Sequence, residues 1–460
     1  ERAPLGPRGP GAAKMPAETR RLHLEPRDLA HINTVSRREH RSAVECLKKE
    51  FKGRVLEARR NFSPGEVIFT EEPLLIVQEE EDDVSEAKRK LERHCARQSE
   101  TFPLESFFYW CALRCLTSEQ LQNFKGAAPA SIEAQLQRKL LLLYHDPKAE
   151  SEPSAAARSL ARTFAPKAAP GLLERLIQIW VLNGFDYAGS PKGNAVYFLS
   201  SFMSHSCLPN AVWHYSDDRI VVRARSEIRR GEEVCISYYP EHWLLQTAPQ
   251  RRWDLHVDKD FWCTCARCTG RRDWSRGFKC PRCRDGIVFG ATPLAPAETD
   301  ALTPQELLGA QCCTCLHVLL RQEAHALCDK EAALQAQLDS FARREDAGEG
   351  SKRRSKVLSE AEKLSEKAAA AEMESLVEEA FAQHSSAECA WTLLAEFYRS
   401  RGLWHEQSRL LERRCAFYQA SYPGTLASYA WLLEERADLL ERCSLGHQGE
   451  ARGARPPAPR

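Results

Sequence analysis

Residues 202–210, Phe-Met-Ser-His-Ser-Cys-Leu-Pro-Asn, and residues 261–268, Phe-Trp-Cys-Thr-Cys-Ala-Arg-Cys, determine the architecture of this chain. The second stretch is a compact Cys-x-Cys-x-x-Cys motif, and the first contains a single distant cysteine. Together they provide four thiolates, from Cys207, Cys263, Cys265 and Cys268. Four thiolates form the closed tetrahedral ligand set of a structural zinc ion. The sequence therefore predicts a Zn²⁺ site that ties two distant segments together.

A second cysteine cluster follows the first. It consists of two Cys-x-x-Cys pairs separated by a longer stretch, namely Cys280, Cys283, Cys312 and Cys315. This spacing is typical of a zinc ribbon, in which each pair contributes half of a tetrahedral site. Cys313 could replace Cys312 as a ligand, and two chance pairs of reduced thiols are the alternative to a metal site. Because four thiolates leave no open position for water, we expect both zinc ions to be structural.

Length and composition agree with a multidomain protein. At 460 residues the chain is longer than a single core usually grows, so two or three domains are expected. The 65 basic and 64 acidic residues give a net charge of +1, which provides no argument for a strongly charged partner. The sequence contains neither a long apolar run nor a signal-peptide pattern. We therefore expect an intracellular protein, in the cytoplasm or the nucleus, with reduced cysteines and no membrane partner.

The two ends of the chain differ in character from its middle. Residues 1–45 and 446–460 lack apolar periodicity, and the outermost parts are rich in Pro, Gly, Arg and Ala, so we expect both segments to be poorly ordered. The first residue is Glu1, and Met15 is an alternative start. Residues 46–78 contain short strand patterns with a Pro-Gly turn.

Helical and cysteine-rich segments follow. Residues 79–175 show leucines at spacings of four and three and predict a helical insertion. Residues 176–270 return to short strands and end in the first cysteine cluster, and residues 271–330 hold the second. Residues 331–368 form a charged linker that enters a helix. Residues 369–445 are helical, with a spacing that resembles tetratricopeptide (TPR) pairs, although a generic helical bundle fits equally well.

The order of these motifs resembles that of the SET-domain protein lysine methyltransferases, in particular the SET and MYND (SMYD) branch. The resemblance implies an α+β fold, in which a SET domain of short strands with a knot-like crossing is split by a helical insertion. A post-SET zinc site, a zinc ribbon and a TPR-like helical domain would follow. It further implies S-adenosyl-L-methionine as cofactor. The MYND zinc module is missing, because Cys95, Cys111 and Cys115 do not supply its ligand pattern and are better interpreted as ordinary thiols.

The resemblance also implies site residues. It places the catalytic tyrosine at Tyr238 and a channel aromatic at Phe185, in an Asn-Gly-Phe segment. Lysine methylation is a direct displacement that depends on alignment in a narrow apolar channel, whose aromatic faces favour cationic groups. The residues implied to bind the cofactor are Lys52, Arg54, Ser204, His205, Asn210 and Phe261. Each aromatic residue, considered by itself, could instead be an ordinary core residue.

Three positions depart from the family pattern. Val55 replaces a glycine, Ser204 replaces an asparagine, and Lys259 replaces a channel tyrosine. They support an alternative, a catalytically silent SET scaffold that binds partner proteins through its zinc modules and helical domain. A nucleic-acid partner is not expected, because the basic residues are scattered without a stacking array. We expect an S-adenosylmethionine-dependent protein-lysine N-methyltransferase acting on a histone or a non-histone protein, with the C-terminal helical domain available to partner proteins.

Overall fold

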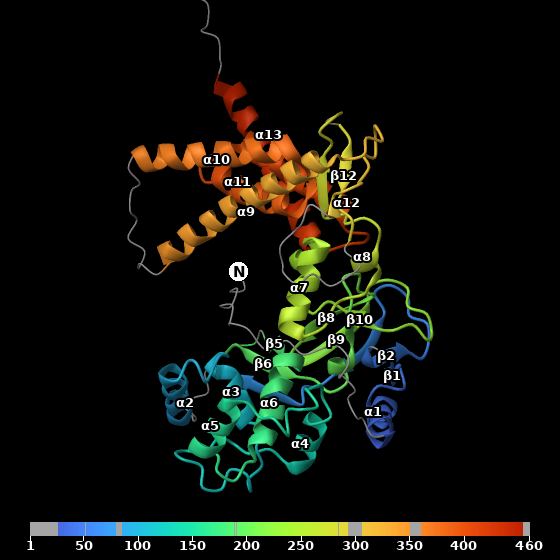
Figure 1. Cartoon of the computed structure of the whole chain (residues 1–460), viewed down its shortest axis with the longest axis vertical. Coiled ribbons are helices and arrows are strands. Elements are labelled where there is room, and N and C mark those ends of the chain that lie inside the picture. Colours follow the sequence, from blue (N-terminus) through green and yellow to red (C-terminus); the bar gives the residue numbers. More distant parts are fainter. Residues whose placement is uncertain are drawn as a thin grey trace, which may run out of the picture. The chain divides into compact units, whose positions relative to one another are not determined.

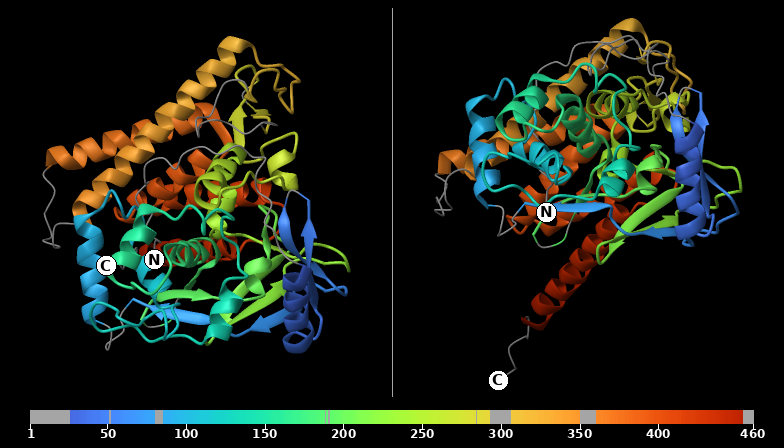
Figure 2. Two further views of the ribbon diagram at one scale, coloured as in Figure 1. Left: turned by 60° about the horizontal axis from the view of Figure 1, so that its bottom comes forward. Right: turned by 90° about the horizontal axis from the view of Figure 1, so that it is seen from below.

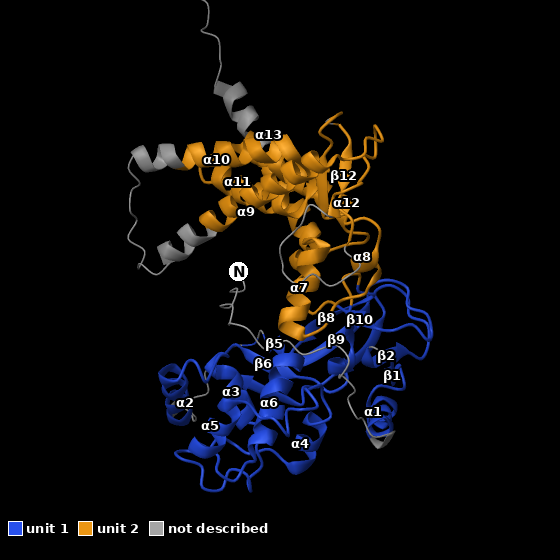
Figure 3. Ribbon diagram, viewed as in Figure 1, with its two compact units in different colours: residues 1–205, 209–236 blue, residues 206–208, 237–460 orange. Residues whose placement is uncertain are grey.

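The computed structural model describes residues 26–50, 52–79, 85–187, 189, 191–283, 285–292, 306–349 and 360–453 (Figure 1). The chain forms two compact units (Figure 3). Unit 1 comprises residues 1–205 and 209–236, and unit 2 comprises residues 206–208 and 237–460. The predictions for residues 1–25 and 454–460 lie outside the described residues. Figure 2 shows the elements of each unit from two further sides.

The described residues of unit 1 form four small sheets, each built from strands of two to six residues. Their strands are β1 (Val44–Lys49) with β2 (Gly53–Ala58), β3 (Val67–Glu71) with β9 (Arg219–Ala224) and β8 (Ala211–Ser216), β4 (Leu75–Gln78) with β6 (Gly193–Val196) and β5 (Phe185–Tyr187), and β7 (Ser204–His205) with β10 (Cys235–Ile236). Side chains of β8 alternate between the interior and the surface, as a strand period of two requires. In the central strand β9, Ile220 and Val222 are fully buried.

The short parallel pair of β7 and β10 joins two distant parts of unit 1. Ser204 lies opposite Cys235, and His205 lies opposite Ile236. Asn210 reinforces this pairing, because its Nδ2 donates to the Glu233 carbonyl at 2.8 Å. Its Oδ1 accepts from the Cys235 N–H at 2.8 Å. The Ser-His-Ser-Cys box is therefore held against the strand that leads to Tyr238.

The described residues between β4 and β5 include the helices α2 (Ser85–Arg97), α3 (Ser106–Leu113), α4 (Ala134–Leu140), α5 (Ala155–Thr163) and α6 (Pro170–Asn183). Helix α6 begins with Pro170, which fits the first turn of a helix. The indole Nε1 of Trp180, on this helix, donates a hydrogen bond to Cys115 Sγ at 3.1 Å. Cys111 and Cys115 are fully buried and Cys95 nearly so, which confirms their interpretation as ordinary core thiols.

The prediction that residues 1–45 form a poorly ordered arm is wrong for residues 26–45. Residues 26–45 are not an irregular arm but form α1 (Pro26–Glu39) and the start of β1. Ile32 and Val35 of this helix are buried, and Asn33 Nδ2 donates to the Cys46 carbonyl at 3.0 Å. The helix is polar overall, so packing against the sheet stabilises it more than its own sequence does.

Unit 2 begins with η4 (Glu241–Leu245), α7 (Ala248–Lys259) and α8 (Ala266–Thr269), followed by β11 (Arg276–Lys279) and β12 (Ile287–Phe289). The remaining elements are α9 (Arg321–Glu349), α10 (Glu360–Ala380), β13 (Phe381–His384), α11 (Ser385–Arg399), α12 (Trp404–Ser421) and α13 (Ala427–Gly453). None of the helices in the described part of the chain combines the length and the apolar character that crossing a bilayer requires.

Three predictions for unit 2 need correction. Residues 369–445 are not helical throughout, because β13 joins β11 in the order β12-β11-β13. Its Phe381 packs against Phe278 of β11 at 5.6 Å between ring centroids, a tertiary contact that local propensity cannot reveal. Helix α9 begins inside the stretch assigned to the ribbon and runs through part of the expected linker, because Leu327, Leu334 and Leu338 bury one face of the helix.

The third correction concerns the C-terminal tail. Helix α13 extends to Gly453, although residues 446–460 were expected to be poorly ordered. Its first half buries Leu432 and Leu439. Once a helix is nucleated, adding residues costs little, so it continues past its packed part.

Candidate functional site

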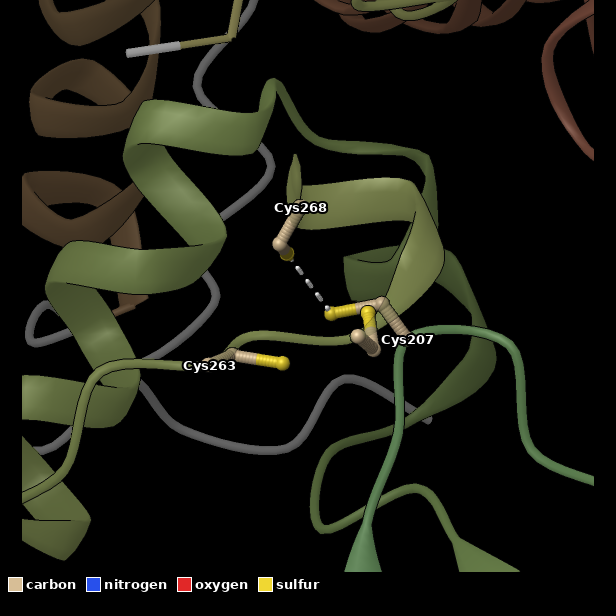
Figure 4. Close-up of side chains that lie close together, drawn as sticks. Cys207, Cys263 and Cys268 are labelled. Carbon is tan, nitrogen blue, oxygen red and sulfur yellow. Dashed lines mark hydrogen bonds between the residues drawn. The ribbon is translucent and has the colours of Figure 1, made fainter. Parts of the chain in front are cut away.

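The four cysteines of the first cluster meet in unit 2. Cys207 lies in residues 206–208, and Cys263 and Cys265 precede α8, which carries Cys268. The four sulfur atoms lie within 4.8 Å of one another, and Cys207 Sγ is 3.5 Å from Cys268 Sγ (Figure 4). A tetrahedral zinc ion with Zn–S bonds of about 2.3 Å needs sulfur separations of about 3.8 Å. The group fits Zn²⁺ in geometry and in ligand type.

The surroundings of this cluster favour a negatively charged centre. Arg251 is 1% exposed, and its Nη2 lies 3.9 Å from Cys268 Sγ. Arg267 is also buried and donates to the Cys207 carbonyl at 3.2 Å. A buried guanidinium is stable only when nearby negative charge or hydrogen bonds compensate it. One zinc ion with four thiolates would carry two negative charges and would supply this compensation.

The second cluster forms an equally close group. Cys280, Cys283, Cys312 and Cys315 have their sulfurs within 4.8 Å of one another. Opposite pairs are 3.7 Å apart for Cys280 and Cys315, and 3.8 Å apart for Cys283 and Cys312. Cys313 lies outside this group, and its sulfur instead accepts from the Ile287 N–H at 3.2 Å. Of the two alternatives that the sequence leaves open, the geometry selects Cys312.

Backbone amides point at the sulfurs of the second cluster. Gly286 N–H donates to Cys283 Sγ at 3.3 Å. Thr314 and Cys315 N–H donate to Cys312 Sγ at 3.4 and 3.5 Å. Such hydrogen bonds favour the thiolate over the thiol, because the donors are aimed at the charged form. The arrangement suits a metal ligand better than a neutral cysteine.

Tyr238 lies two residues beyond β10, in unit 2, and is 38% exposed. Its ring meets that of Phe261 edge to face, with centroids 6.2 Å apart and planes at 83°. Phe261 is partly buried against the core of unit 2, two residues before Cys263 of the first cysteine cluster. The cysteine cluster therefore fixes the segment that carries Phe261.

The neighbouring tyrosine has a different environment. Tyr239 stacks on Trp243 with centroids 4.2 Å apart, and its hydroxyl donates to Asp258 Oδ2 at 2.5 Å. Burial and this hydrogen bond raise the pKa of Tyr239. Its hydroxyl is thus engaged in the structure of unit 2.

Lys259 is the last residue of α7 and is partly buried. The helix ends at Asp260, whose φ of 57° is left-handed.

Three predicted cofactor residues of unit 1 have side chains engaged with the protein itself. Lys52 Nζ lies 2.8 Å from Glu233 Oε2. Arg54 is buried, donates to the Leu142 carbonyl and lies 4.8 Å above the Phe202 ring. Asn210 uses both ends of its amide on backbone groups, as described above. His205 is buried and Ser204 partly buried in β7.

Phe185 lies in an aromatic cluster that sequence analysis missed. Its ring meets Tyr197 at 5.6 Å and Trp213 at 5.4 Å, both edge to face. Tyr215 continues the cluster, 5.1 Å from Trp213. Trp213 and Tyr215 stand two residues apart on β8, so the period of two was the signal that could have indicated a shared aromatic face.

Glu71 is a second residue that sequence analysis missed. Its carboxylate is 5% exposed and accepts from Leu199 N–H at 2.5 Å and from Ser200 N–H at 2.9 Å. It therefore anchors η3 (Ser200–Phe202), which leads into the Ser-His-Ser-Cys box. Burial raises the pKa of Glu71 to about 7, although these hydrogen bonds lower it in part. Nothing in the local sequence distinguishes this glutamate from a surface residue.

The predicted residues thus form two groups. Phe185, Lys52, Arg54, Ser204, His205 and Asn210 belong to unit 1, and Tyr238, Phe261 and all eight cysteines belong to unit 2.

Comparison with known proteins identifies the central part of the chain. The SET domain family model matches residues 53–239. Histone-lysine N-methyltransferase ASHR2 of Arabidopsis thaliana is 34% identical over 95 residues, which cover 19% of this chain and 23% of that protein. Protein-lysine N-trimethyltransferase SMYD5 of Gallus gallus is 32% identical over 84 residues, covering 18% of this chain and 20% of that protein.

A longer match extends to SET domain-containing protein SmydA-8, isoform B, of Drosophila melanogaster. It is 29% identical over 150 residues, which cover 31% of this chain and 32% of that protein. The matched segments therefore span between a fifth and a third of these relatives. Among solved structures, the SET domain of LSMT bound to lysine and AdoHcy aligns with 90% of this chain and 98% of its own, at 13% identity. Its TM-score of 0.29 is too low to support an inference.

Proposed function

From the SET domain at residues 53–239 and its similarity to SMYD-type methyltransferases, we propose that this protein transfers a methyl group from S-adenosyl-L-methionine to a lysine side chain of a protein substrate. The SET-domain match carries the proposal, because it extends from Gly53 through Tyr238 in a single segment. The relatives are named as histone-lysine and protein-lysine methyltransferases, so both a histone and a non-histone protein are candidate substrates.

The residues present are compatible with the cofactor. Burial lowers the pKa of Arg54 to about 10, so its guanidinium stays protonated at neutral pH and can attract a carboxylate. We assign Phe261 to contact with the adenine of the cofactor, and Lys52 and Arg54 to contact with its carboxylate. Ser204 and His205 are assigned to the surface beside them. Because both ends of the Asn210 amide are bonded to backbone groups, we assign it the role of a positioning residue.

When bound, S-adenosylmethionine supplies an electrophilic methyl group on a sulfonium. The lysine amine would have to be neutral and aligned with that carbon, so that the N–C bond could form as the C–S bond breaks, and the methylated amine would then release a proton to solvent. We propose that the Tyr238 hydroxyl orients the amine and that Phe185 provides an aromatic wall that excludes water. The aromatic cluster around Phe185 keeps its ring in one orientation.

The finer architecture is also a proposal. We interpret residues 79–175, which contain α2 to α5 and the start of α6, as an insertion that splits the SET domain. We interpret the first cysteine cluster as a post-SET zinc site and the second as a zinc ribbon, each with one Zn²⁺. We interpret residues 369–445 as a TPR-like domain open to partner proteins. Two groups of four cysteines with metal-ligand geometry favour an intracellular location, where thiols stay reduced and available to a metal ion.

The alternative is a silent SET scaffold, which the departures at Val55, Ser204 and Lys259 favour. Calorimetry of S-adenosylmethionine with the purified chain separates the two hypotheses, since the scaffold predicts no binding. Tyr238→Phe should reduce turnover by at least tenfold and leave cofactor affinity nearly unchanged, because the hydroxyl acts on the amine.

Tyr239→Phe is the matched control. It removes a hydroxyl that bonds to Asp258, so it should cost about 1 kcal/mol of stability without a comparable loss of turnover. Absence of cofactor binding in the wild type, or equal turnover in Tyr238→Phe, would refute the proposed function or the role of Tyr238, respectively.

A further inference from the structure

Unit 2 contains a surface hollow of about 440 Å³ beside the first cysteine cluster. Its lining comes from α8, from the loop that follows α8, and from residues next to Cys207 and after α12, namely Leu208, Ala266, Arg267, Gly270, Arg271, Arg272, Trp274 and Pro423. Leu208 is 38% exposed and Trp274 is 44% exposed. The lining thus combines apolar side chains with arginines and contains no carboxylate.

The two surface arginines of this hollow are not neutralised by the protein. Arg271 and Arg272 are exposed, and within the described part of the chain neither forms an ion pair. Arg272 lies 5.9 Å from the Trp274 ring centroid, which leaves its charge available. Asp273 stands between Arg272 and Trp274 in the sequence. Its side chain is 2% exposed and accepts hydrogen bonds from the Ala248 and Ser275 N–H groups. It points inward and does not compensate the two arginines.

The nearby cysteine cluster does not cancel this charge either. A zinc ion with four thiolates would carry two negative charges, and the buried Arg251 and Arg267 next to it carry two positive charges. Arg267 is also held rigidly, because it donates to the carbonyls of Leu244 at 2.7 Å and Ser421 at 3.2 Å. Among the residues that the structure describes, no carboxylate therefore compensates the charge of Arg271 and Arg272 at the hollow.

We propose that this hollow binds an acidic segment of a partner protein, with carboxylates on Arg271 and Arg272 and an apolar side chain against Leu208 and Trp274. Carboxylates form charge-assisted, often bidentate hydrogen bonds with arginine, and an exposed tryptophan is a common anchor in protein interfaces. A nucleic acid fits less well, because it needs a longer basic stripe with several stacking rings, whereas this hollow offers two arginines and one tryptophan. The site differs from the proposed methyl-transfer site and does not depend on it.

Fluorescence anisotropy with the zinc-loaded full chain tests the proposal. The probes are a fluorescein-labelled Glu-Asp-Leu-Glu-Asp-Leu peptide and its neutral counterpart Gln-Asn-Leu-Gln-Asn-Leu. The acidic peptide should bind at least tenfold more tightly, and the difference should shrink with added salt. The combined change Arg271→Glu and Arg272→Glu should abolish the difference. Trp274→Ala should weaken binding of the acidic peptide severalfold.

The matched control reverses two exposed arginines elsewhere in unit 2, Arg321→Glu with Arg442→Glu, and should leave binding unchanged. All four positions are exposed, so the substitutions should not affect folding. Equal binding of the two peptides, unchanged binding by the Arg271 and Arg272 variant, or an equal loss in the control would overturn the proposal. Tighter binding of a twelve-residue oligothymidine that displaces the acidic peptide would assign the hollow to nucleic acid instead, and would also overturn it.

Discussion

Gly286→Ala tests whether the second cysteine cluster holds a metal ion. A Cβ at this position would overlap Cys312 Sγ and lie 2.9 Å from Thr314 Cβ. Carbon atoms in contact are about 3.5 to 4.0 Å apart, so Thr314 must move by about 0.6 Å or more, and the sulfur by more than that. A tetrahedral zinc site tolerates changes of only about 0.2 Å in its bonds. The substitution should therefore displace one ligand.

The expected loss of zinc affinity at this site is about 10-fold to 100-fold, as when the surroundings of a metal ligand are disturbed. Elemental analysis should give two zinc ions per chain for the wild type, and a chromophoric chelator should remove one of them much faster from Gly286→Ala. Cys313→Ser is the matched control, because this sulfur lies outside the group of four and its loss should not change the release rate. If Gly286→Ala released zinc at the same rate as the wild type, Cys312 would not be a ligand.

Two further predictions concern buried charges. Arg276 is fully buried, with Nη2 2.7 Å from Glu331, so Arg276→Met should lower the free energy of unfolding by about 3 to 5 kcal/mol, measured with urea at fixed zinc. The matched change Lys330→Met removes a partly exposed lysine that pairs with the exposed Glu379 and should cost at most about 1 kcal/mol; equal losses would contradict this. Because the folded pKa of Glu71 is raised to about 7, its stabilising contribution is complete below pH 4.5 and is lost as pH rises to 7. Between pH 4.5 and pH 7, the free energy of unfolding of the wild type should fall by about 3 kcal/mol relative to that of Glu71→Gln. A difference between the two proteins that does not change with pH would be inconsistent with the raised pKa.

Local sequence patterns were sufficient for several features. The SET resemblance rested on motifs in order along the chain, and the family match over residues 53–239 confirms it. Both cysteine clusters were predicted from spacing alone, and each brings its four sulfurs together in the structure. Metal-ligand spacing is informative because a tight turn fixes the distance between the two sulfurs of each Cys-x-x-Cys pair.

Other features depend on contacts between residues far apart in the chain. The sequence could not show that Asn210 and Arg54 have their side chains engaged with backbone carbonyls, that Glu71 is buried, or that Phe381–His384 pairs with β11. Nor could it show that the Asp273 carboxylate is buried and accepts hydrogen bonds from backbone N–H groups instead of pairing with Arg271 or Arg272. The amino-acid sequence by itself determined the SET motifs and the close-spaced cysteines of both clusters, because short spacings along the chain fix which side chains can meet, whereas the choice of Cys312 over Cys313 required the structure. Only the tertiary structure decided which polar side chains are engaged and which remain available, because burial and hydrogen bonding are set by partners that no local pattern specifies.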